Sequence, residues 1–245
     1  MKLNLKGLII KEYIVGESDK YITLFSESRG LLQVSAKNAK KYNTALAAGT
    51  QMFVYGNFSL NKTRNTYKII DVEILNMFHK LREDIVSLAY ASYIMEFIQE
   101  VAKEQVRDRE LFRLTLYTLH EFTKAKLPKS MVKCVFELVA LKYLGLMPNL
   151  EYCVECNKPV DNKYNFSIES GGYVCENCKQ VYIKISEDTF IAMKYMLQSP
   201  LNKLFHFKAS DKVIREFNKV IEQYTIYYIE KKFTTANFIK ELENI

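Results

Sequence analysis

The sequence predicts an α+β protein in which a small five-stranded barrel precedes an α-helical domain that carries an inserted four-cysteine module. Three observations predict this fold class. Strand-like segments fill residues 1–80, apolar residues recur at three- and four-residue steps from Leu81 onward, and two Cys-x-x-Cys pairs interrupt the helical pattern. The chain has 245 residues, of which 49% are hydrophobic, so it is long enough to form more than one well-packed domain.

Turn sequences divide the first eighty residues into five strand-like segments. The segments are rich in β-branched and aromatic residues and are bounded by Gly, Ser, Asn and Asp. In order they are LKGLIIKEYIV, KYITLF, LLQVSAK, QMFVYGNFSL and TYKIIDVEIL. Five short strands with a longer connection between the third and the fourth are typical of a small closed barrel, for which the OB-fold is the natural candidate. We therefore assign residues 1–80 to an OB-fold domain.

From Leu81 the apolar pattern becomes that of amphipathic helices. The helical segments are LREDIVSLAYASYIMEFIQEVAKE, RELFRLTLYTLHEFTK, LPKSMVKCVFELVALKYLG, SEDTFIAMKYML and SDKVIREFNKVIEQYTIYYIEKK. The last of these has one apolar stripe, formed by Val213, Phe217, Val220, Tyr224 and Tyr227. We expect residues 81–150 and 181–245 to form one helical domain.

Residues 151–180 form the inserted module, and they contain four of the five cysteines. The two pairs have 18 residues between them and consist of Cys153, Cys156, Cys175 and Cys178. Each Cys-x-x-Cys supplies two thiolates from one tight turn, and this spacing is typical of a structural zinc site. The intervening residues predict a small hairpin, since Gly171 and Gly172 can adopt a positive φ. The module therefore has the pattern of a zinc ribbon.

The expected role of the metal is structural. A catalytic zinc ion needs an open coordination position, whereas here cysteine fills all four positions and the segment contains no histidine. We expect one structural Zn²⁺ ion as the cofactor. The fifth cysteine, Cys134, lies in a helical pattern, and we expect it to be buried as a small apolar residue.

The excess positive charge of the chain is concentrated in the predicted barrel. The formal net charge is +7, and residues 1–80 contain 12 Lys and Arg against 6 Asp and Glu. A basic domain attracts polyanions, so we interpret residues 1–80 as a nucleic-acid-binding domain. The candidate DNA-binding cations lie at the predicted turns: Lys20, Arg29, Lys37, Lys40, Lys41, Lys62 and Arg64. The alternative for each of them is an ordinary solvated loop charge.

Two aromatic residues of the fourth predicted strand are candidates for stacking on unpaired bases. If QMFVYGNFSL is extended throughout, Phe53 and Tyr55 lie among polar residues on the face opposite Val54 and Phe58. Aromatic rings on a polar face resemble the platforms on which barrels hold unpaired bases. The alternative is that both rings lie beneath the helical domain.

The sequence contains no pattern that predicts catalysis. His79, His120 and His206 are far apart, no glycine-rich phosphate loop is present, and periodicity brings no acidic residues together into a Mg²⁺ site. We therefore expect a protein that is not an enzyme and binds no nucleotide. No apolar run reaches the ~18 residues needed to cross a bilayer, and the first residues do not resemble a signal peptide, so we expect a cytoplasmic protein without membrane association.

Four separated segments resemble the recombination mediator RecO family, in the family's order. They are GESDKYITLFSESRGLLQVSAKNAKK, LREDIVSLAYASYIMEFIQEV, FELVALKYLGLMPNLEYCVEC and GGYVCENC. Together they extend the resemblance over nearly the whole chain, and the agreement of their spacing makes it more specific than the cysteine pairs alone. The sequence departs from the family's pattern at Asn38, where glycine is expected.

The resemblance implies a nucleoid-associated role in recombinational DNA repair. It implies binding of single- and double-stranded DNA, annealing of complementary strands and, together with RecR, loading of RecA onto strands coated by the single-stranded-DNA-binding protein (SSB). It also implies that the helical domain binds the acidic C-terminal tail of SSB. The candidates for that contact are Lys129 and Lys133, which lie one helical turn apart.

Two other functions stay open on the sequence alone. One is a zinc-ribbon adaptor that binds only proteins, with the barrel as its scaffold, and the other is an RNA-binding OB-fold protein. Salt-dependent binding to single strands of arbitrary sequence would separate the first from a DNA mediator. Competition by RNA would separate the second.

Overall fold

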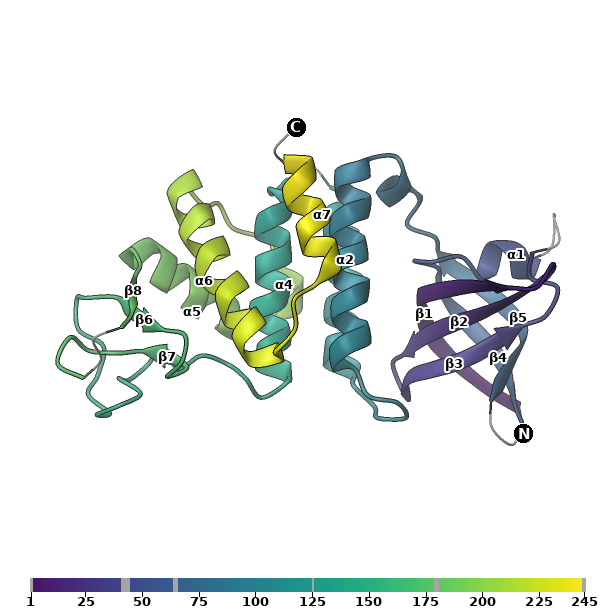
Figure 1. The fold of residues 1–245 in the computed structure, drawn as a ribbon, viewed down its shortest axis with the longest axis horizontal. Coiled ribbons are helices and arrows are strands. Elements are labelled where there is room, and N and C mark those ends of the chain that lie inside the picture. The colour runs from purple at the N-terminus through teal and green to yellow at the C-terminus, as the bar shows by residue number, and fades with distance from the viewer. Residues whose placement is uncertain (1, 41–44, 64–65, 125, 179–180, 244–245) are drawn as a thin grey trace. The chain divides into compact units, whose positions relative to one another are not determined.

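The computed structural model describes residues 2–40, 45–63, 66–124, 126–178 and 181–243 (Figure 1). The chain forms two compact units. The first consists of Met1–Leu119 together with Thr235–Ile245, and the second is His120–Thr234. The second unit is therefore inserted, in sequence, into the first.

The first unit contains the predicted five-stranded barrel, and the barrel is closed. Its strands follow the order β1-β2-β3-β5-β4, with antiparallel neighbours except where β3 and β5 run parallel. The strands are β1 (Lys2–Val15), β2 (Asp19–Ser26), β3 (Gly30–Ala36), β4 (Tyr55–Lys62) and β5 (Tyr67–Asn76). The connection between β3 and β4 contains a short helix, α1 (Ala45–Gly49).

Alternating apolar residues fill the barrel interior, as the period of two predicts. Ile22, Leu24, Val34 and Leu60 are fully buried in one cluster. A bulge between Ile9 and Lys11 interrupts the pairing of β1 with β2. Such a bulge lets one long strand bend, so β1 pairs with β4 through its first half and with β2 through most of its length.

Helices complete the first unit. They are the 3₁₀ turn η1 (His79–Arg82), α2 (Ile85–Val101), most of α3 (Arg109–Phe122) and α7 (Thr234–Glu243). Helix α2 begins later than the sequence pattern predicts, because the Asp84 side chain caps it by accepting hydrogen bonds from the backbone N–H groups of Val86 and Ser87 (3.2 and 3.0 Å).

The first turn of α7 is fastened to α2. The backbone N–H and the hydroxyl of Thr235 both donate to Oε2 of Glu96, at 2.9 and 2.6 Å. At the other end of α7, the Tyr90 hydroxyl donates to the Glu243 carboxylate. Residues near the end of the chain thus complete the unit that contains its beginning.

The second unit is helical apart from a small sheet. Its elements are α4 (Lys129–Tyr143), α5 (Glu187–Gln198), the 3₁₀ turn η2 (Leu201–Lys203) and α6 (Asp211–Ile229), with β6 (Asn165–Ser167), β7 (Gly172–Tyr173) and β8 (Ile183–Lys184). Strands β6 and β7 form the predicted hairpin, and β8 adds a third strand beside β6. Four residues of the predicted α6 stripe are buried, but Tyr227 is 50% exposed.

Among the described residues, every helix is too short or too polar to cross a membrane.

Candidate functional site

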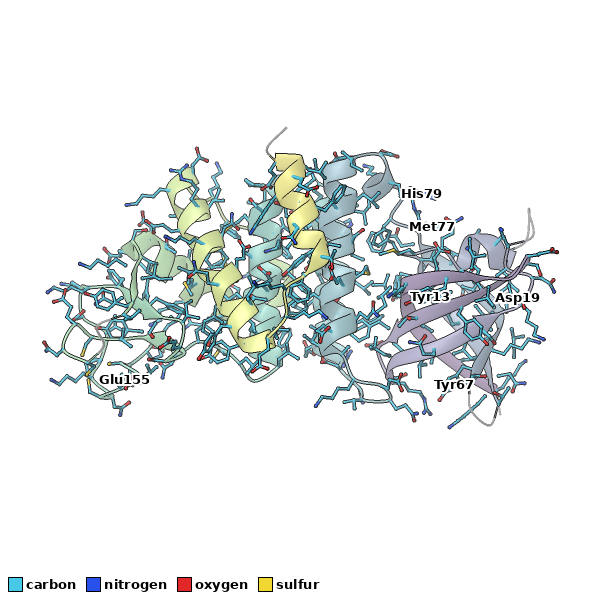
Figure 2. All side chains as sticks on the ribbon, viewed as in Figure 1. Tyr13, Asp19, Tyr67, Met77, His79 and Glu155 are labelled. Atoms are coloured by element: carbon cyan, nitrogen blue, oxygen red, sulfur yellow. The ribbon has the colours of Figure 1, made fainter. Side chains whose placement is uncertain are left out.

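The four cysteines of the inserted module come together at one point. Their Sγ atoms all lie within 4.8 Å of one another, and those of Cys156 and Cys175 are 3.7 Å apart. A tetrahedral zinc ion with Zn–S bonds of about 2.3 Å would place its sulfur ligands about 3.8 Å apart. Both pairs therefore contribute to one cluster with the dimensions of a four-thiolate metal site. Glu155 marks the place of this cluster in Figure 2.

The backbone shapes both cysteine turns around the sulfur atoms. The N–H of Asn157, whose φ is +60°, donates to the carbonyl of Cys153 (2.8 Å), and the N–H of Cys178 donates to the carbonyl of Cys175 (3.1 Å). The N–H of Cys175 donates to Sγ of Cys153 (3.3 Å). An N–H that points at sulfur stabilises the thiolate, which is the form that binds metal.

The protonation of the cysteines also fits a cation site. Burial alone would raise the pKa of Cys153, but backbone N–H donors, first that of Cys175, lower the pKa to about 6. Hydrogen bonds to the sulfurs of Cys156 and Cys175 raise the pKa of Cys178 to about 12. Thiolates at this distance repel one another, so the fully deprotonated set needs a cation at its centre. A soft divalent metal ion is the group that this donor set fits.

Exposure within the cluster is uneven. Cys153 and Cys175 are buried, whereas Cys156 and Cys178 are exposed. The cluster thus lies at the surface of the module, where an ion can enter. Next to the buried Cys153, the N–H of Val154 donates to the carbonyl of Tyr173 in β7 (3.0 Å). Cys134 lies outside the cluster: as expected it is buried, and its thiol donates to Oδ1 of Asn218 (2.6 Å). Burial raises the pKa of Cys134 well above its ordinary value.

The turn after β3 presents two of the predicted cations to solvent. Lys37 and Lys40 are exposed, and neither has an ion-pair partner in the described part of the chain. The turn is held against the β1–β2 turn, because the Asn38 N–H donates to Oδ1 of Asp19 (2.8 Å) and the Lys40 N–H donates to the carbonyl of Ser18 (3.0 Å). Asn38 has a φ of +56°, a left-handed conformation that asparagine adopts more often than most residues other than glycine. The departure from the family pattern at this position therefore preserves the turn.

The other predicted cations do not join this turn as one cluster. Lys20 pairs with Glu12 at 2.6 Å and is largely buried, so an internal partner already neutralises its charge. Arg29 precedes Gly30 in the turn that joins β2 to β3, at the opposite end of the hairpin from Lys37. The ammonium of Lys62 lies 5.9 Å from the centre of the Tyr67 ring, at the end of β4. Two further candidates lie outside the described residues: Lys41 and Arg64.

The prediction that Phe53 faces outward is wrong. Phe53 is 2% exposed, and its backbone has a φ of +69° instead of an extended conformation. Strand β4 begins only at Tyr55, so alternation counted from Gln51 does not apply to Phe53. Tyr55 is half-buried, with its ring centre 6.1 Å from that of Phe112 in α3. For Tyr55, the alternative that the ring packs beneath a helix is the one observed.

Aromatic residues that the sequence analysis missed do lie on the outside of the barrel. Tyr13 in β1 and Tyr21 in β2 are 46% and 41% exposed, and each is the direct cross-strand partner of the other. Alternation from Lys11 onward places Tyr13 on the face of Lys11, but alternation through the whole of LKGLIIKEYIV would place Tyr13 with the buried Leu5 and Ile9. The bulge between Ile9 and Lys11 exchanges the two faces, so sequence periodicity alone does not show that Tyr13 points outward. Tyr13 is labelled on the barrel in Figure 2.

Lys133 does not lie at the surface, where the predicted contact with the acidic tail of SSB would require it. Lys133 is 9% exposed, and its ammonium pairs with Oε2 of Glu137 at 3.0 Å. Burial alone would lower the pKa of Lys133, but the adjacent Glu137 carboxylate outweighs it and raises the pKa. Lys129, at the first residue of α4, is half-buried. The two lysines thus do not form an exposed pair.

Comparison with known proteins covers nearly the whole chain. The model of the family "Recombination protein O N terminal" matches residues 1–78, and that of "Recombination protein O C terminal" matches residues 82–236. The chain is 32% identical to the DNA repair protein RecO of Acetivibrio thermocellus, over 99% of this chain and 98% of that protein. It is 27% identical to the DNA repair protein RecO of Bacillus subtilis, over 98% of this chain and 94% of that protein.

The two family models match, in order, the region of the closed barrel and the helical region that contains the four-cysteine cluster, and the relatives are DNA repair and recombination proteins, so the chain is of this class. Within this class, the chain belongs to the recombination protein O (RecO) family.

Proposed function

We propose that this protein is a DNA-binding recombination mediator. It binds single- and double-stranded DNA, anneals complementary strands and, together with RecR, helps to load RecA onto SSB-coated strands. The observation that carries the proposal is the match of the chain to the RecO family from residue 1 to residue 236, with only residues 79–81 between the two matched regions.

Annealing fits a protein of this kind because it makes and breaks no covalent bond. Two strands anneal when their phosphate repulsion is screened and their bases are brought together. Exposed lysines do this without nucleotide hydrolysis. Lys37 and Lys40, exposed beside the β1–β2 turn, support this mechanism, as does the excess of positive charge in residues 1–80. The protein acts in the cytoplasm, at the nucleoid.

The four-cysteine cluster binds one zinc ion in this proposal. Cys153, Cys156, Cys175 and Cys178 supply four thiolates, which fill the tetrahedral shell of the ion. The ion supplies folding free energy to the module and no Lewis-acid chemistry, because four protein ligands leave no position for water or substrate.

Strand annealing with and without SSB tests the proposed function. Fluorescence energy transfer between two labelled complementary oligonucleotides should rise faster with the protein than without it, for both naked and SSB-coated strands. A protein that accelerates neither reaction at low salt contradicts the proposal. In the same mixtures, labelled DNA incubated with Mg²⁺ should stay intact, since no enzymatic activity is proposed.

A further inference from the structure

Each turn of the four-cysteine cluster contains one buried and one exposed cysteine. The first cysteine of each turn is buried, since Cys153 is 1% exposed and Cys175 is 6% exposed. The second cysteine of each turn is exposed, and these two are Cys156 and Cys178. A small molecule dissolved in water therefore reaches the cluster at Cys156 or Cys178 and not at the buried pair.

Cys156 also has a buried sulfur atom beside it. Its Sγ lies 3.7 Å from that of Cys175, which belongs to the other turn. A disulfide bond joins two sulfur atoms about 2 Å apart, so these two atoms need to approach each other by only about 1.7 Å. Cys153 is held differently, because its Sγ accepts a hydrogen bond from the N–H of Cys175 (3.3 Å).

An exposed sulfur atom next to a buried one is the arrangement that peroxide-sensitive cysteines have. The thiolate is the nucleophilic form of cysteine, and a cysteine that binds metal is a thiolate. An accessible thiolate attacks peroxide, and a neighbouring thiolate then resolves the oxidised sulfur into a disulfide. Cys156 meets the first condition and Cys175 meets the second.

We propose that Cys156 is a site of oxidation by hydrogen peroxide and that Cys175 is its resolving residue. The Cys156 thiolate attacks one peroxide oxygen, the O–O bond breaks, and the products are a sulfenic acid at Cys156 and a hydroxide ion. The Cys175 thiolate then attacks the sulfur of the sulfenic acid, an S–S bond forms, and a second hydroxide ion leaves. The two sulfur atoms lose two electrons in total, and with two protons from solvent the peroxide becomes two molecules of water.

The reaction removes two of the four thiolates that would hold the metal. Cys153 and Cys178 alone leave a zinc ion with half of its protein ligands, so the ion is lost to solvent. The module then lacks the ion that stabilises it, although Phe166 of β6 packs against Tyr224 of α6 with ring centres 5.6 Å apart. This inference rests on the zinc ion proposed above and goes beyond it, because it assigns a reactive role to the same sulfur atoms.

Treatment of zinc-loaded full-length protein with hydrogen peroxide tests the proposal. A metallochromic indicator should report the release of one zinc ion per chain. Mass spectrometry of the alkylated and digested protein should find a disulfide between Cys156 and Cys175. Dimedone, which captures sulfenic acids, should label Cys156 when it is present during the reaction. A thiol reductant with added zinc should restore the original metal content.

Two histidine variants form a matched pair. Cys156→His removes the oxidisable sulfur but keeps a ligand that zinc accepts, so it should retain zinc and release it at least about tenfold more slowly in peroxide. Cys178→His makes the same exchange at the other exposed cysteine, leaves Cys156 and Cys175 in place, and should release zinc as fast as wild type. Cys134→Ala removes the buried cysteine outside the cluster and should also behave as wild type.

The outcomes distinguish this inference from the proposed function. Protein that binds no zinc under reducing conditions overturns both the proposed metal site and this inference. Protein that keeps its zinc in peroxide, or loses it through a disulfide between any other two cysteines, overturns this inference alone. Should the histidine variants fail to bind zinc, dimedone decides on wild-type protein: a label at Cys156 supports the proposal, and the absence of that label overturns it. Strand annealing is measured separately and does not depend on either result.

Discussion

The barrel and the four-cysteine module solve the same problem of stability in different ways. The barrel closes its sheet and buries a continuous apolar cluster that includes Ile22, Leu24, Val34, Phe58 and Leu60. The module has strands of only two or three residues and gathers its four sulfur atoms instead. A segment this short buries too little apolar surface to be stable alone, and the proposed metal ion would supply the folding free energy that a larger core supplies elsewhere. Removal of the metal should therefore destabilise the module and not the barrel, whereas a cavity in the apolar core should destabilise the barrel and not the module.

Removal of the metal should have the largest effect, and it should affect only the module. The Cys175→Ser variant, or wild-type protein treated with a strong chelator, should lose local folding free energy on the order of 10 kcal/mol. Elemental analysis should find one zinc per chain in wild type and none in the variant. Hydrogen exchange should show that residues 151–178 lose protection while β1 to β5 keep it. Cys134→Ala is the control, and it should retain one zinc per chain.

Damage to the barrel core should give the converse result. Phe58 is 1% exposed inside the barrel, and Phe58→Ala should cost about 3–5 kcal/mol of unfolding free energy because it leaves a cavity. Chemical denaturation followed by circular dichroism measures the loss. The zinc content should stay at one per chain. Leu75→Ala, which truncates a residue that is 46% exposed in β5, should change stability by less than about 0.5 kcal/mol. A loss of zinc in Phe58→Ala would contradict the independence of the two regions.

Charge reversal in the barrel should change DNA affinity without changing stability. Lys37→Glu/Lys40→Glu should weaken DNA binding at least about tenfold at low salt and reduce the salt slope by roughly 0.7–0.9 for each phosphate that the protein no longer neutralises. Anisotropy titrations between low and moderate salt measure both quantities. The matched control is Lys203→Glu/Lys219→Glu, which makes the same charge change at exposed positions of the second unit. Equal decreases in affinity for the two variants would mean that only net charge matters.

The smallest expected effect concerns the Glu216 carboxylate, which accepts hydrogen bonds from residues that follow β8. Oε2 of Glu216 accepts hydrogen bonds from the N–H and hydroxyl of Ser186 (2.8 and 2.6 Å) and from the hydroxyl of Thr189 (2.8 Å). Burial would raise the pKa of Glu216, but these donors outweigh it and lower the pKa. The carboxylate therefore stabilises the fold above its unfolded pKa, and this stabilisation is lost as the pH falls through the lowered folded pKa.

Glu216→Gln should accordingly destabilise the protein by about 1 kcal/mol at neutral pH. The difference in stability between wild type and variant should shrink as the pH falls below about 4, because the wild-type carboxyl group then becomes protonated and, like the amide of the variant, carries no charge. Thermal melts at several pH values measure it. A difference that is independent of pH would show that the amide substitution acts through packing.

The features that the sequence predicts correctly are those set by local patterns. Alternation marks the barrel strands, and the spacing of Cys153, Cys156, Cys175 and Cys178 marks a cluster that the structure brings within 4.8 Å. The sequence analysis missed features that depend on tertiary contacts. The partner of Lys20 is Glu12 in the neighbouring strand. Phe53 is buried because it precedes β4, which begins at Tyr55 and not at Gln51, and the Arg82 guanidinium lies 5.9 Å from its ring centre.

Helical periodicity has the same limit. Lys133 lies on a helix whose residues 131–141 are all buried, so no polar face exists there for a lysine to occupy. Periodicity identifies the helix but cannot show that neighbours surround it. The sequence analysis also missed helix α7, whose hydrogen bonds are with Glu96 and Tyr90, far away in sequence. A residue's exposure depends on such distant partners, which one sequence does not reveal.

The return of α7 to α2 has a consequence for the order of folding during synthesis. The first unit includes residues from 235 onward, so a ribosome must synthesise all of His120–Thr234 before that unit has its last helix. The barrel can close early, because its strands end at Asn76, while α2 must wait for α7. Until then Glu96 and Tyr90 lack the hydrogen bonds to α7 that they have in the finished chain. A nascent chain stalled before residue 235 should thus contain a folded barrel beside an unfinished α2.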